Sequence, residues 1–235
     1  MNGYRVAPLG APIDAVVRVP GSKSIANRAL VCAALAEGQS VLSNVPDGDD
    51  TKSMIDCLHA LGLGIEVTDE AEASDIESDD DSYDDSYLGS TVRVRGGRSC
   101  LRPGPITLRA GLAGTTSRFL TALCALGRGA YTIDGDAPLR ARPMAPLHDA
   151  MSALGASVRP AGNAGRLPVT IEGPFDLSSD EVTMAGDVSS QYLTALMLVA
   201  PYFSNGLRFM LSTPLVSRPY VRMTAAIMDQ FGVPG

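Results

Sequence analysis

The chain has 235 residues, 45% of them apolar, which is enough to bury the core of one large domain or two small ones. Aromatic residues make up only 5% and tryptophan is absent, which argues against a surface that stacks the bases of single-stranded nucleic acid. The net charge of −7 is unevenly spread, because residues 69–88 hold ten acidic side chains and neither Lys nor Arg. The other residues carry 19 basic and 16 acidic side chains, a balance that suits a small anionic ligand more than DNA.

The cysteines and histidines indicate neither disulfides nor a metal site. No two cysteines form a C-x-x-C pair and most fall in apolar patterns, so we interpret them as reduced thiols of a cytoplasmic protein. They are Cys32, Cys57, Cys100 and Cys124. His59 and His148 lack the spacing of metal ligands. No signal peptide is recognisable, and the longest apolar run, residues 193–203, is too short to span a bilayer.

The first predicted elements are a strand over residues 13–19 and a helix from about residue 22 to 37. Pro20 and Gly21 separate them, and Ser22 or Ser24 can cap the helix. Lys23 lies in the turn and Arg28 about one helical turn further on. Since a helix start offers free N–H groups and partial positive charge, this stretch predicts a site for a phosphate or carboxylate. The alternative is a capped helix with two solvated cations.

The next predicted elements are a strand over 40–45, a helix from Asp49 closed by Gly62, and strands over 65–67 and 91–95. The acidic segment 69–88 falls between the last two strands. We interpret it as an inserted surface loop that stays disordered, because it is dense in charge and poor in apolar residues. An interaction tail is the alternative.

The same order of elements recurs twice more. The second copy has a helix opening at 113–116, a strand over 131–134, a helix from Pro143 and a strand over 167–172. The third has a helix opening at 188–191, a strand over 207–211 and a helix from Pro219 to about residue 231. The second helix of each unit ends in a similar pair, Leu61-Gly62, Leu154-Gly155 or Phe231-Gly232. The first two pairs are further apart in the sequence than the last two, by roughly the length of the acidic segment.

This pattern predicts an α/β fold with parallel strand pairings. Three units that cannot bury their sheets alone are expected to pack about a pseudo-threefold axis, with the helices inside. The first helix of each unit begins with small or hydroxylated residues, so three helix N-termini are expected to meet at one face. These starts are 22–24, 114–116 and 189–191. The third unit has no strands after its second helix, so we expect the chain to be the first part of a longer enzyme.

Five short motifs follow one another over nearly the whole chain. They are residues 20–24 with Asn27 and Arg28, residues 113–115 with Arg118, Arg142-Pro143, residues 186–191 and residues 217–220. Taken in this order, they resemble the motifs of the 5-enolpyruvylshikimate-3-phosphate synthase family, the 3-phosphoshikimate 1-carboxyvinyltransferases. Many members of that family have Asn and Pro where this chain has Leu112 and Phe119.

The resemblance implies an enolpyruvyl transferase-like inverse α/β domain, built from three β-α-β-α-β-β units about a pseudo-threefold axis. The family has two such domains, which close on each other. Residues 1–20 would hold the first strand of the partner, C-terminal domain. Residues 21–235 would form the three-unit substrate-binding domain, with the third unit incomplete and the acidic insertion at 69–88.

The reaction implied by the resemblance transfers the enolpyruvyl group of phosphoenolpyruvate to the 5-hydroxyl of shikimate 3-phosphate, a step towards chorismate and the aromatic amino acids. It needs no metal or organic cofactor. The expected partners are these two anionic substrates and the C-terminal domain, with no nucleic acid and no membrane. The family's proton-transfer carboxylates lie in that other domain, so we expect no catalytic residue in this chain and no activity from it alone.

The same resemblance implies two sets of binding residues. Phosphoenolpyruvate would contact Lys23, Gly114, Thr115, Arg142 and Gln191. Shikimate 3-phosphate would contact Lys23, Ser24, Arg28, Ser189, Ser190, Gln191, Ser217 and Tyr220. Plainer roles stay open: Ser189 and Ser190 as helix caps, Tyr220 as a core residue, and Arg118 as a structural ion-pair partner.

Two other functions compete with this one. A non-catalytic module could keep the fold and bind anions without chemistry. The sister enolpyruvyl transferase that acts on a UDP-sugar shares the fold, but it is not expected to carry residues 189–191 together with 217–220.

Overall fold

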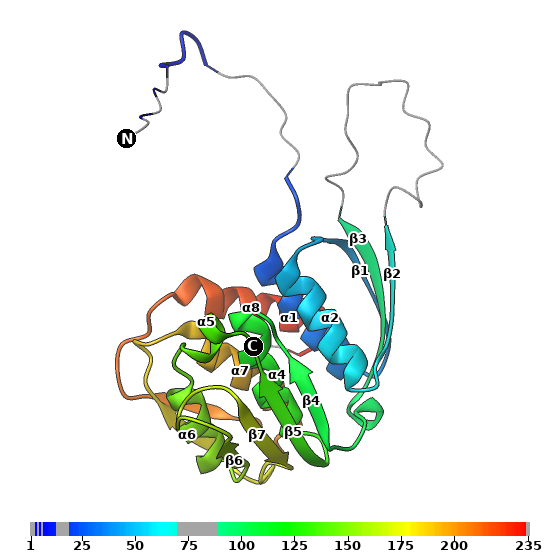
Figure 1. The fold of residues 1–235 in the computed structure, drawn as a ribbon, viewed down its shortest axis with the longest axis vertical. Helices are drawn as coiled ribbons and strands as arrows, with labels where there is room; N and C mark the ends of the chain where they lie inside the picture. The colour runs from blue at the N-terminus through cyan, green and yellow to red at the C-terminus, as the bar shows by residue number, and fades with distance from the viewer. Residues whose placement is uncertain (1–2, 4, 6, 13–18, 70–88, 234–235) are drawn as a thin grey trace.

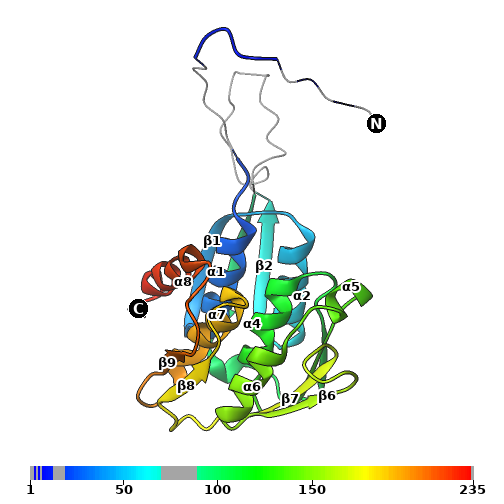
Figure 2. The ribbon, with the colours of Figure 1, turned by 90° about the vertical axis from the view of Figure 1, so that its left-hand side faces the viewer.

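Three small sheets surround a central group of helices (Figures 1 and 2). This computed structural model describes residues 3, 5, 7–12, 19–69 and 89–233. The first helices of the three units are α1 (Lys23–Leu35), α4 (Gly114–Cys124) and α7 (Ser190–Val199), and they pack against one another. All of α4 except Thr115 is buried. The expected arrangement, with helices inside and sheets outside, is confirmed.

The first unit consists of α1, β1 (Gly38–Val45), α2 (Asp49–Ala60), β2 (Gly64–Asp69) and β3 (Ser90–Gly96). β3 lies between β1 and β2 and is antiparallel to both. β1 and β2 therefore run parallel to each other without being neighbours. Asp69 at the end of β2 pairs with Ser90 at the start of β3, whereas the acidic residues 70–88 lie outside the described residues.

The second unit has the same plan with one more strand. Its elements are η2 (Arg98–Cys100), β4 (Ile106–Arg109), α4, β5 (Gly129–Asp134), α5 (Ala137–Arg140), α6 (Ala145–Ala153), β6 (Ser157–Pro160) and β7 (Val169–Gly173). The sheet order is β4-β5-β7-β6, with β4 parallel to β5 and the other two pairings antiparallel. α4 therefore connects two adjacent parallel strands, and β7 lies between β5 and β6 as β3 lies between β1 and β2.

Glycine pairs mark the same position in these two units. Gly38 of β1 is opposite Gly96 of β3, and Gly129 of β5 is opposite Gly173 of β7. A methyl group on Gly96 would lie 1.9 Å from the carbonyl oxygen of Ala33, and one on Gly173 would lie 2.6 Å from that of Ala125. Glycine is required in both units because the end of the first helix approaches the last strand too closely for a side chain.

The third unit consists of β8 (Glu181–Met184), α7, η3 (Ala200–Tyr202), β9 (Arg208–Leu211) and α8 (Arg218–Gln230). Its two strands are parallel and are joined through α7. Its described part contains no counterparts of β6 and β7. An apolar groove of about 430 Å³ lies between α7, β9 and α8, and its lining includes Leu193, Met197, Phe209, Val221 and Met228.

Several predictions from sequence were wrong or incomplete. Parallel pairings were expected, and β4-β5 and β8-β9 are parallel, but the other four of the six pairings are antiparallel. In the first two units the last strand, β3 or β7, inserts between two strands that run parallel to each other. α1 ends at Leu35 instead of residue 37, and Gly38 already belongs to β1. The short strands β4, β6 and β8 and the helix α5 were not predicted.

Two other expectations concern the ends of the domain and the membrane. The strand predicted for residues 13–19 lies outside the described residues up to residue 18, so its place in a partner domain stays a prediction. None of the helices in the described part of the chain has both the length and the apolar character that crossing a membrane requires.

Candidate active site

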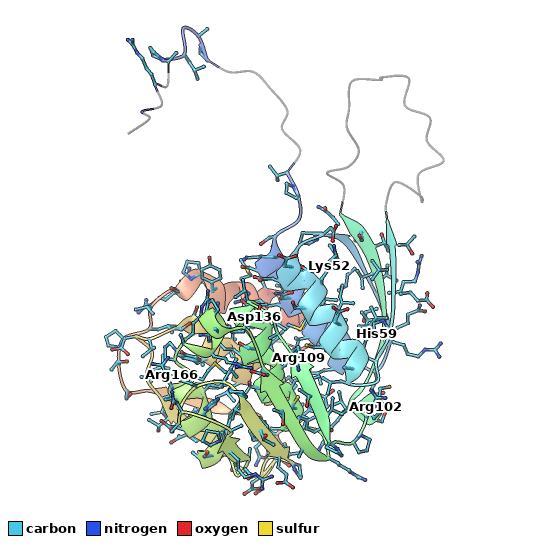
Figure 3. The ribbon with its side chains drawn as sticks, viewed as in Figure 1. Lys52, His59, Arg102, Arg109, Asp136 and Arg166 are labelled. Atoms are coloured by element: carbon cyan, nitrogen blue, oxygen red, sulfur yellow. The ribbon has the colours of Figure 1, made fainter. Side chains whose placement is uncertain are left out.

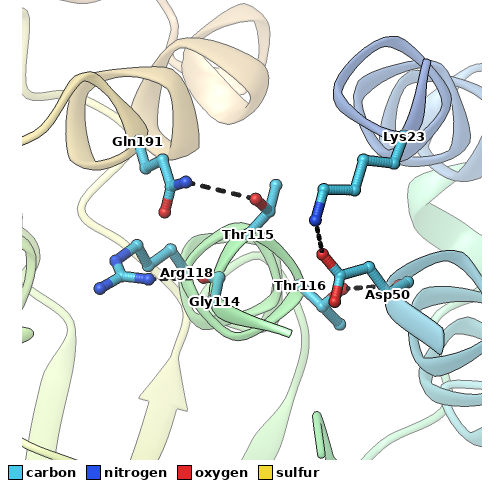
Figure 4. Close-up of polar contacts among 7 residues, drawn as sticks. All are labelled: Lys23, Asp50, Gly114, Thr115, Thr116, Arg118 and Gln191. Atoms are coloured by element: carbon cyan, nitrogen blue, oxygen red, sulfur yellow. Dashed lines mark hydrogen bonds and ion pairs between the residues drawn. The ribbon is translucent and has the colours of Figure 1, made fainter. Parts of the chain in front are cut away.

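Four helix N-termini meet around Thr115 and are joined by polar contacts (Figure 4). Gln191, in the first turn of α7, donates from Nε2 to Thr115 Oγ1 of α4 at 3.3 Å. On the other side of α4, Thr116 Oγ1 donates to the backbone oxygen of Asp50 at 3.2 Å. Lys23, the first residue of α1, pairs with the Asp50 carboxylate. The predicted meeting of α1, α4 and α7 therefore includes α2 as well.

Lys23 and Asp50 form the ion pair of this face. Lys23 Nζ lies 2.8 Å from Asp50 Oδ2, and the side chains are 68% and 24% exposed. The pair is held largely in solvent, so its net contribution to stability is small. Its effect on the site is to aim the ammonium group towards the start of α2 while leaving it accessible to a ligand.

Gly114 lies between two arginine side chains. A methyl group at this position would lie 2.6 Å from Arg118 Nη1 and 2.8 Å from Arg142 Nη1. Arg142 is exposed and Arg118 is buried, and neither forms an ion pair with any carboxylate in the described ranges. Two uncompensated guanidinium groups beside a helix N-terminus create a strong preference for an anion.

Arg118 also holds the backbone around the site. Its Nη1 donates to Gly114 O at 2.8 Å and its Nη2 to Pro143 O at 3.3 Å. The guanidinium carbon lies 5.4 Å from the ring centroid of Tyr192, whose hydroxyl donates to the same Pro143 oxygen at 2.6 Å. Arg118 is therefore not the ion-pair partner that one alternative predicted among the described residues, because its hydrogen-bond acceptors are backbone oxygens.

The start of α7 presents hydroxyl groups beside α4. Ser189 is the N-cap, and its Oγ accepts from the backbone N–H of Gln191 at 3.2 Å. Ser190 is buried in the first turn. Ser189 is thus a helix cap in this structure, and its hydroxyl hydrogen is free to donate to a ligand.

Arg28 links α1 to α8 in the interior. Its exposure is 2%, its Nε donates to Thr224 Oγ1 at 2.8 Å, and its Nη1 donates to Ser24 O at 2.7 Å. The guanidinium lies 5.4 Å from the ring of Phe119 and 5.7 Å from that of Tyr220. Burial lowers the pKa of Arg28, since desolvation disfavours its charged form.

The remaining predicted residues lie at the start of α8. Ser217 is exposed and has a left-handed backbone, with φ of 56°. Tyr220 is 45% exposed, so it is not the core residue that one alternative proposed. Ser24, half-buried, is connected to this group because its carbonyl accepts from Arg28. The residues predicted to bind phosphoenolpyruvate therefore lie around the start of α4. Those predicted to bind shikimate 3-phosphate lie partly there, at Lys23 and the start of α7, and partly around Arg28 and the start of α8.

Comparison with known proteins decides between the families considered above. The sequence model of the EPSP synthase family, described as 3-phosphoshikimate 1-carboxyvinyltransferase, matches residues 9–234. The chain belongs to the EPSP synthase family.

Curated relatives with this family's name match almost the whole chain. The 3-phosphoshikimate 1-carboxyvinyltransferase of Shewanella denitrificans is 39% identical over 233 residues, and that of Trichormus variabilis is 35% identical over 233 residues. Each alignment covers 99% of this chain and 50% of the relative. The chain therefore spans about half the length of the curated EPSP synthases it matches.

Solved structures support the fold. An EPSP synthase from Acinetobacter baumannii superposes with a TM-score of 0.68 at 22% identity, covering 86% of this chain and 41% of that one. The enolpyruvyl transferase NikO from Streptomyces tendae gives a TM-score of 0.50 at 14% identity. At these identities the likeness concerns the enolpyruvyl transferase fold alone.

The sequence did not predict three residues that support this site: Asp50, Tyr192 and Thr224. Asp50 falls at the start of a predicted helix, and the other two fall inside predicted helices. The first pairs with Lys23, the second holds Pro143, and the third accepts from Arg28. Each contact joins distant segments, so no local spacing signals it.

The two histidines differ in environment. His59 lies exposed on α2 (Figure 3), whereas His148 on α6 is 5% exposed and its Nε2 has no hydrogen-bond partner. Burial lowers the pKa of His148 to about 4, so its imidazole is neutral at pH 7. Among the described residues, no group of three or more His, Cys, Asp or Glu side chains has a metal-binding arrangement.

Proposed function

We propose that this chain is the substrate-binding half of a 3-phosphoshikimate 1-carboxyvinyltransferase. The complete enzyme would transfer the enolpyruvyl group of phosphoenolpyruvate to the 5-hydroxyl of shikimate 3-phosphate and release phosphate. A second domain would supply the acid and base, so this chain would bind substrates without turning them over. We assign the enzyme to the cytoplasm, in keeping with four free cysteines.

The observation that carries this proposal is the pair of arginines at Gly114. Arg118 and Arg142 approach the first residue of α4 without a carboxylate partner among the described residues, and Lys23, Thr115 and Gln191 border the same helix start. A small molecule that carries both a phosphate and a carboxylate would supply negative charge for these two arginines. We therefore place phosphoenolpyruvate against α4.

The shikimate 3-phosphate assignment rests on the start of α7 and on α8. Ser189 and Ser190 offer hydroxyl donors at a helix N-terminus, where a phosphate is favoured. Ser217 and Tyr220 are exposed at the start of α8, beside Ser24 and Arg28. A ring with a phosphate at one end fits this line of hydroxyl, aromatic and cationic groups.

The test is a double variant, Ser189→Gly with Ser190→Ala. Glycine at an N-cap costs helix stability only a few tenths of a kcal/mol, so the fold is kept while two donors are lost. Losing two hydrogen bonds to a charged phosphate is expected to cost about 2 to 5 kcal/mol of binding free energy. Calorimetric titration with shikimate 3-phosphate measures this loss. Ser152→Ala is the control, because Ser152 donates within α6 to His148 O. Unchanged affinity in the double variant would overturn the assignment.

A further inference from the structure

The Arg142 side chain lies near Gly114 and is exposed. Its guanidinium makes no ion pair with any carboxylate in the part of the chain that the structure describes. An exposed arginine side chain normally samples many rotamers, and ordering it on a ligand costs binding free energy. The position of the Arg142 backbone therefore determines how many of its side-chain rotamers bring the guanidinium to the start of α4.

The backbone on both sides of Arg142 is fixed by hydrogen bonds. The Arg142 N–H donates to Leu139 O at 3.0 Å, and the Met144 N–H donates to Gly165 O at 2.8 Å. Between them, the Pro143 carbonyl accepts from Tyr192 at 2.6 Å and from Arg118 at 3.3 Å. The Pro143 oxygen thus accepts from both α4 and α7, so these two helices hold the segment together.

Tyr192 is buried in a position from which its hydroxyl reaches the Pro143 oxygen. It is 1% exposed on α7, one residue after Gln191, and its ring lies 5.4 Å from the Arg118 guanidinium. The ring contact favours the cation, and the hydroxyl supplies the shorter of the two bonds to Pro143. One side chain therefore contacts both the Arg118 guanidinium and the carbonyl of Pro143, the residue after Arg142.

We infer that Tyr192 is a positioning residue for phosphoenolpyruvate binding, acting through Arg142. Its hydroxyl fixes the Arg142–Pro143 segment so that the Arg142 guanidinium stands beside that of Arg118 at Gly114. The Tyr192 hydroxyl bonds to Pro143, whereas its contact with the predicted shikimate 3-phosphate residues of α7 is made by its backbone N–H, which donates to Ser189 O at 3.3 Å. Loss of the hydroxyl is therefore expected to affect phosphoenolpyruvate binding more than shikimate 3-phosphate binding. This inference rests on the proposed function.

The test is Tyr192→Phe in the complete enzyme, with both halves present. The ring under Arg118 is kept and only the hydroxyl is lost. Loss of one buried hydrogen bond that positions a charged group is expected to raise the KM for phosphoenolpyruvate about 5- to 10-fold. The KM for shikimate 3-phosphate should change less than about 2-fold. Tyr202→Phe is the matched control, because Tyr202 also donates to a backbone oxygen, that of Leu35, away from this site.

A second background separates positioning from simple destabilisation. In Arg142→Ala, the addition of Tyr192→Phe should leave the KM for phosphoenolpyruvate unchanged, because the group being positioned is gone. Equal effects of Tyr192→Phe with and without Arg142, or an unaltered KM in the single variant, would overturn the inference. A wild-type enzyme with no turnover of these substrates would instead refute the proposed function.

Discussion

Lys23 and Asp50 tie the first residue of α1 to the first turn of α2 through an ion pair of 2.8 Å. The carboxylate neutralises the one lysine of the candidate site before any ligand arrives. An incoming phosphate must therefore share the ammonium group with Asp50, or replace it.

Asp50→Asn is expected to strengthen phosphoenolpyruvate binding. Removing the competing negative charge at an exposed pair should lower the dissociation constant about two- to fivefold. Asp49→Asn is the control, because Asp49 lies in the same helical turn without the contact to Lys23. Titration calorimetry at low ionic strength measures both. Weaker binding in Asp50→Asn would mean that the carboxylate holds Lys23 in its binding position instead of competing for it.

Gly114→Ala should impair phosphoenolpyruvate binding far more than shikimate 3-phosphate binding. The added methyl group would lie within 2.8 Å of nitrogens from both Arg118 and Arg142, so both guanidinium groups must move. They are ends of flexible side chains, so the fold should tolerate the change. We expect the KM for phosphoenolpyruvate in the complete enzyme to rise about tenfold or more. Equal increases for both substrates would contradict this location of phosphoenolpyruvate.

Much of this fold follows from the sequence. The helices α1, α4 and α7 are marked by apolar residues at helical spacing and by hydroxylated or small starts, so their residues and their common direction were predictable. The strands β4, β6 and β8 were not, because each has four residues and prolines lie beside or within the first two. A strand that short carries too few alternations to stand out.

The sequence predicted the cations and hydroxyl groups of the candidate site, but not the residues that hold them in place through hydrogen bonds. Lys23, Arg142 and Ser189 fall in motifs at helix starts. Tyr192 and Thr224 support the site from helix positions that look like ordinary core. Their polar partners come from distant segments, since Tyr192 of α7 bonds to Pro143 ahead of α6 and Thr224 of α8 accepts from Arg28 of α1. Such long-range contacts leave no periodic signal in one sequence.

Thr224→Val should destabilise the chain through Arg28. Thr224 is fully buried and accepts from Arg28 Nε, so valine leaves a buried cationic donor without its partner. We expect a loss of about 1 to 3 kcal/mol in the free energy of unfolding, measured by urea titration. Thr121→Val is the matched control, since Thr121 is equally buried and its hydroxyl donates to Ser117 O in its own helix. Similar losses in the two variants would show that Arg28 does not depend on this acceptor.

His148 predicts a pH dependence of stability. Its folded pKa of about 4 lies below the ordinary 6.5, so on acidification the unfolded chain takes up this proton first. The contribution of neutral His148 is complete above pH 6.5 and is lost as the pH falls towards 4, by about 3 kcal/mol. Urea unfolding of wild type and His148→Leu from pH 7.5 to 4 measures the difference. The stability of the variant should fall less steeply over this window, and parallel curves would contradict the assignment.

The measurement that tests the central claim most directly is phosphate release from phosphoenolpyruvate and shikimate 3-phosphate, followed with this chain alone and then with the second half of the enzyme added. If the chain supplies binding and the other half supplies the acid and base, residues 1–235 alone should give no turnover above background. Mixing the two halves should restore it. Robust turnover by the chain alone would contradict the proposal that the other half supplies the acid and base. A mixture that stays inactive while both halves are folded would contradict it as well.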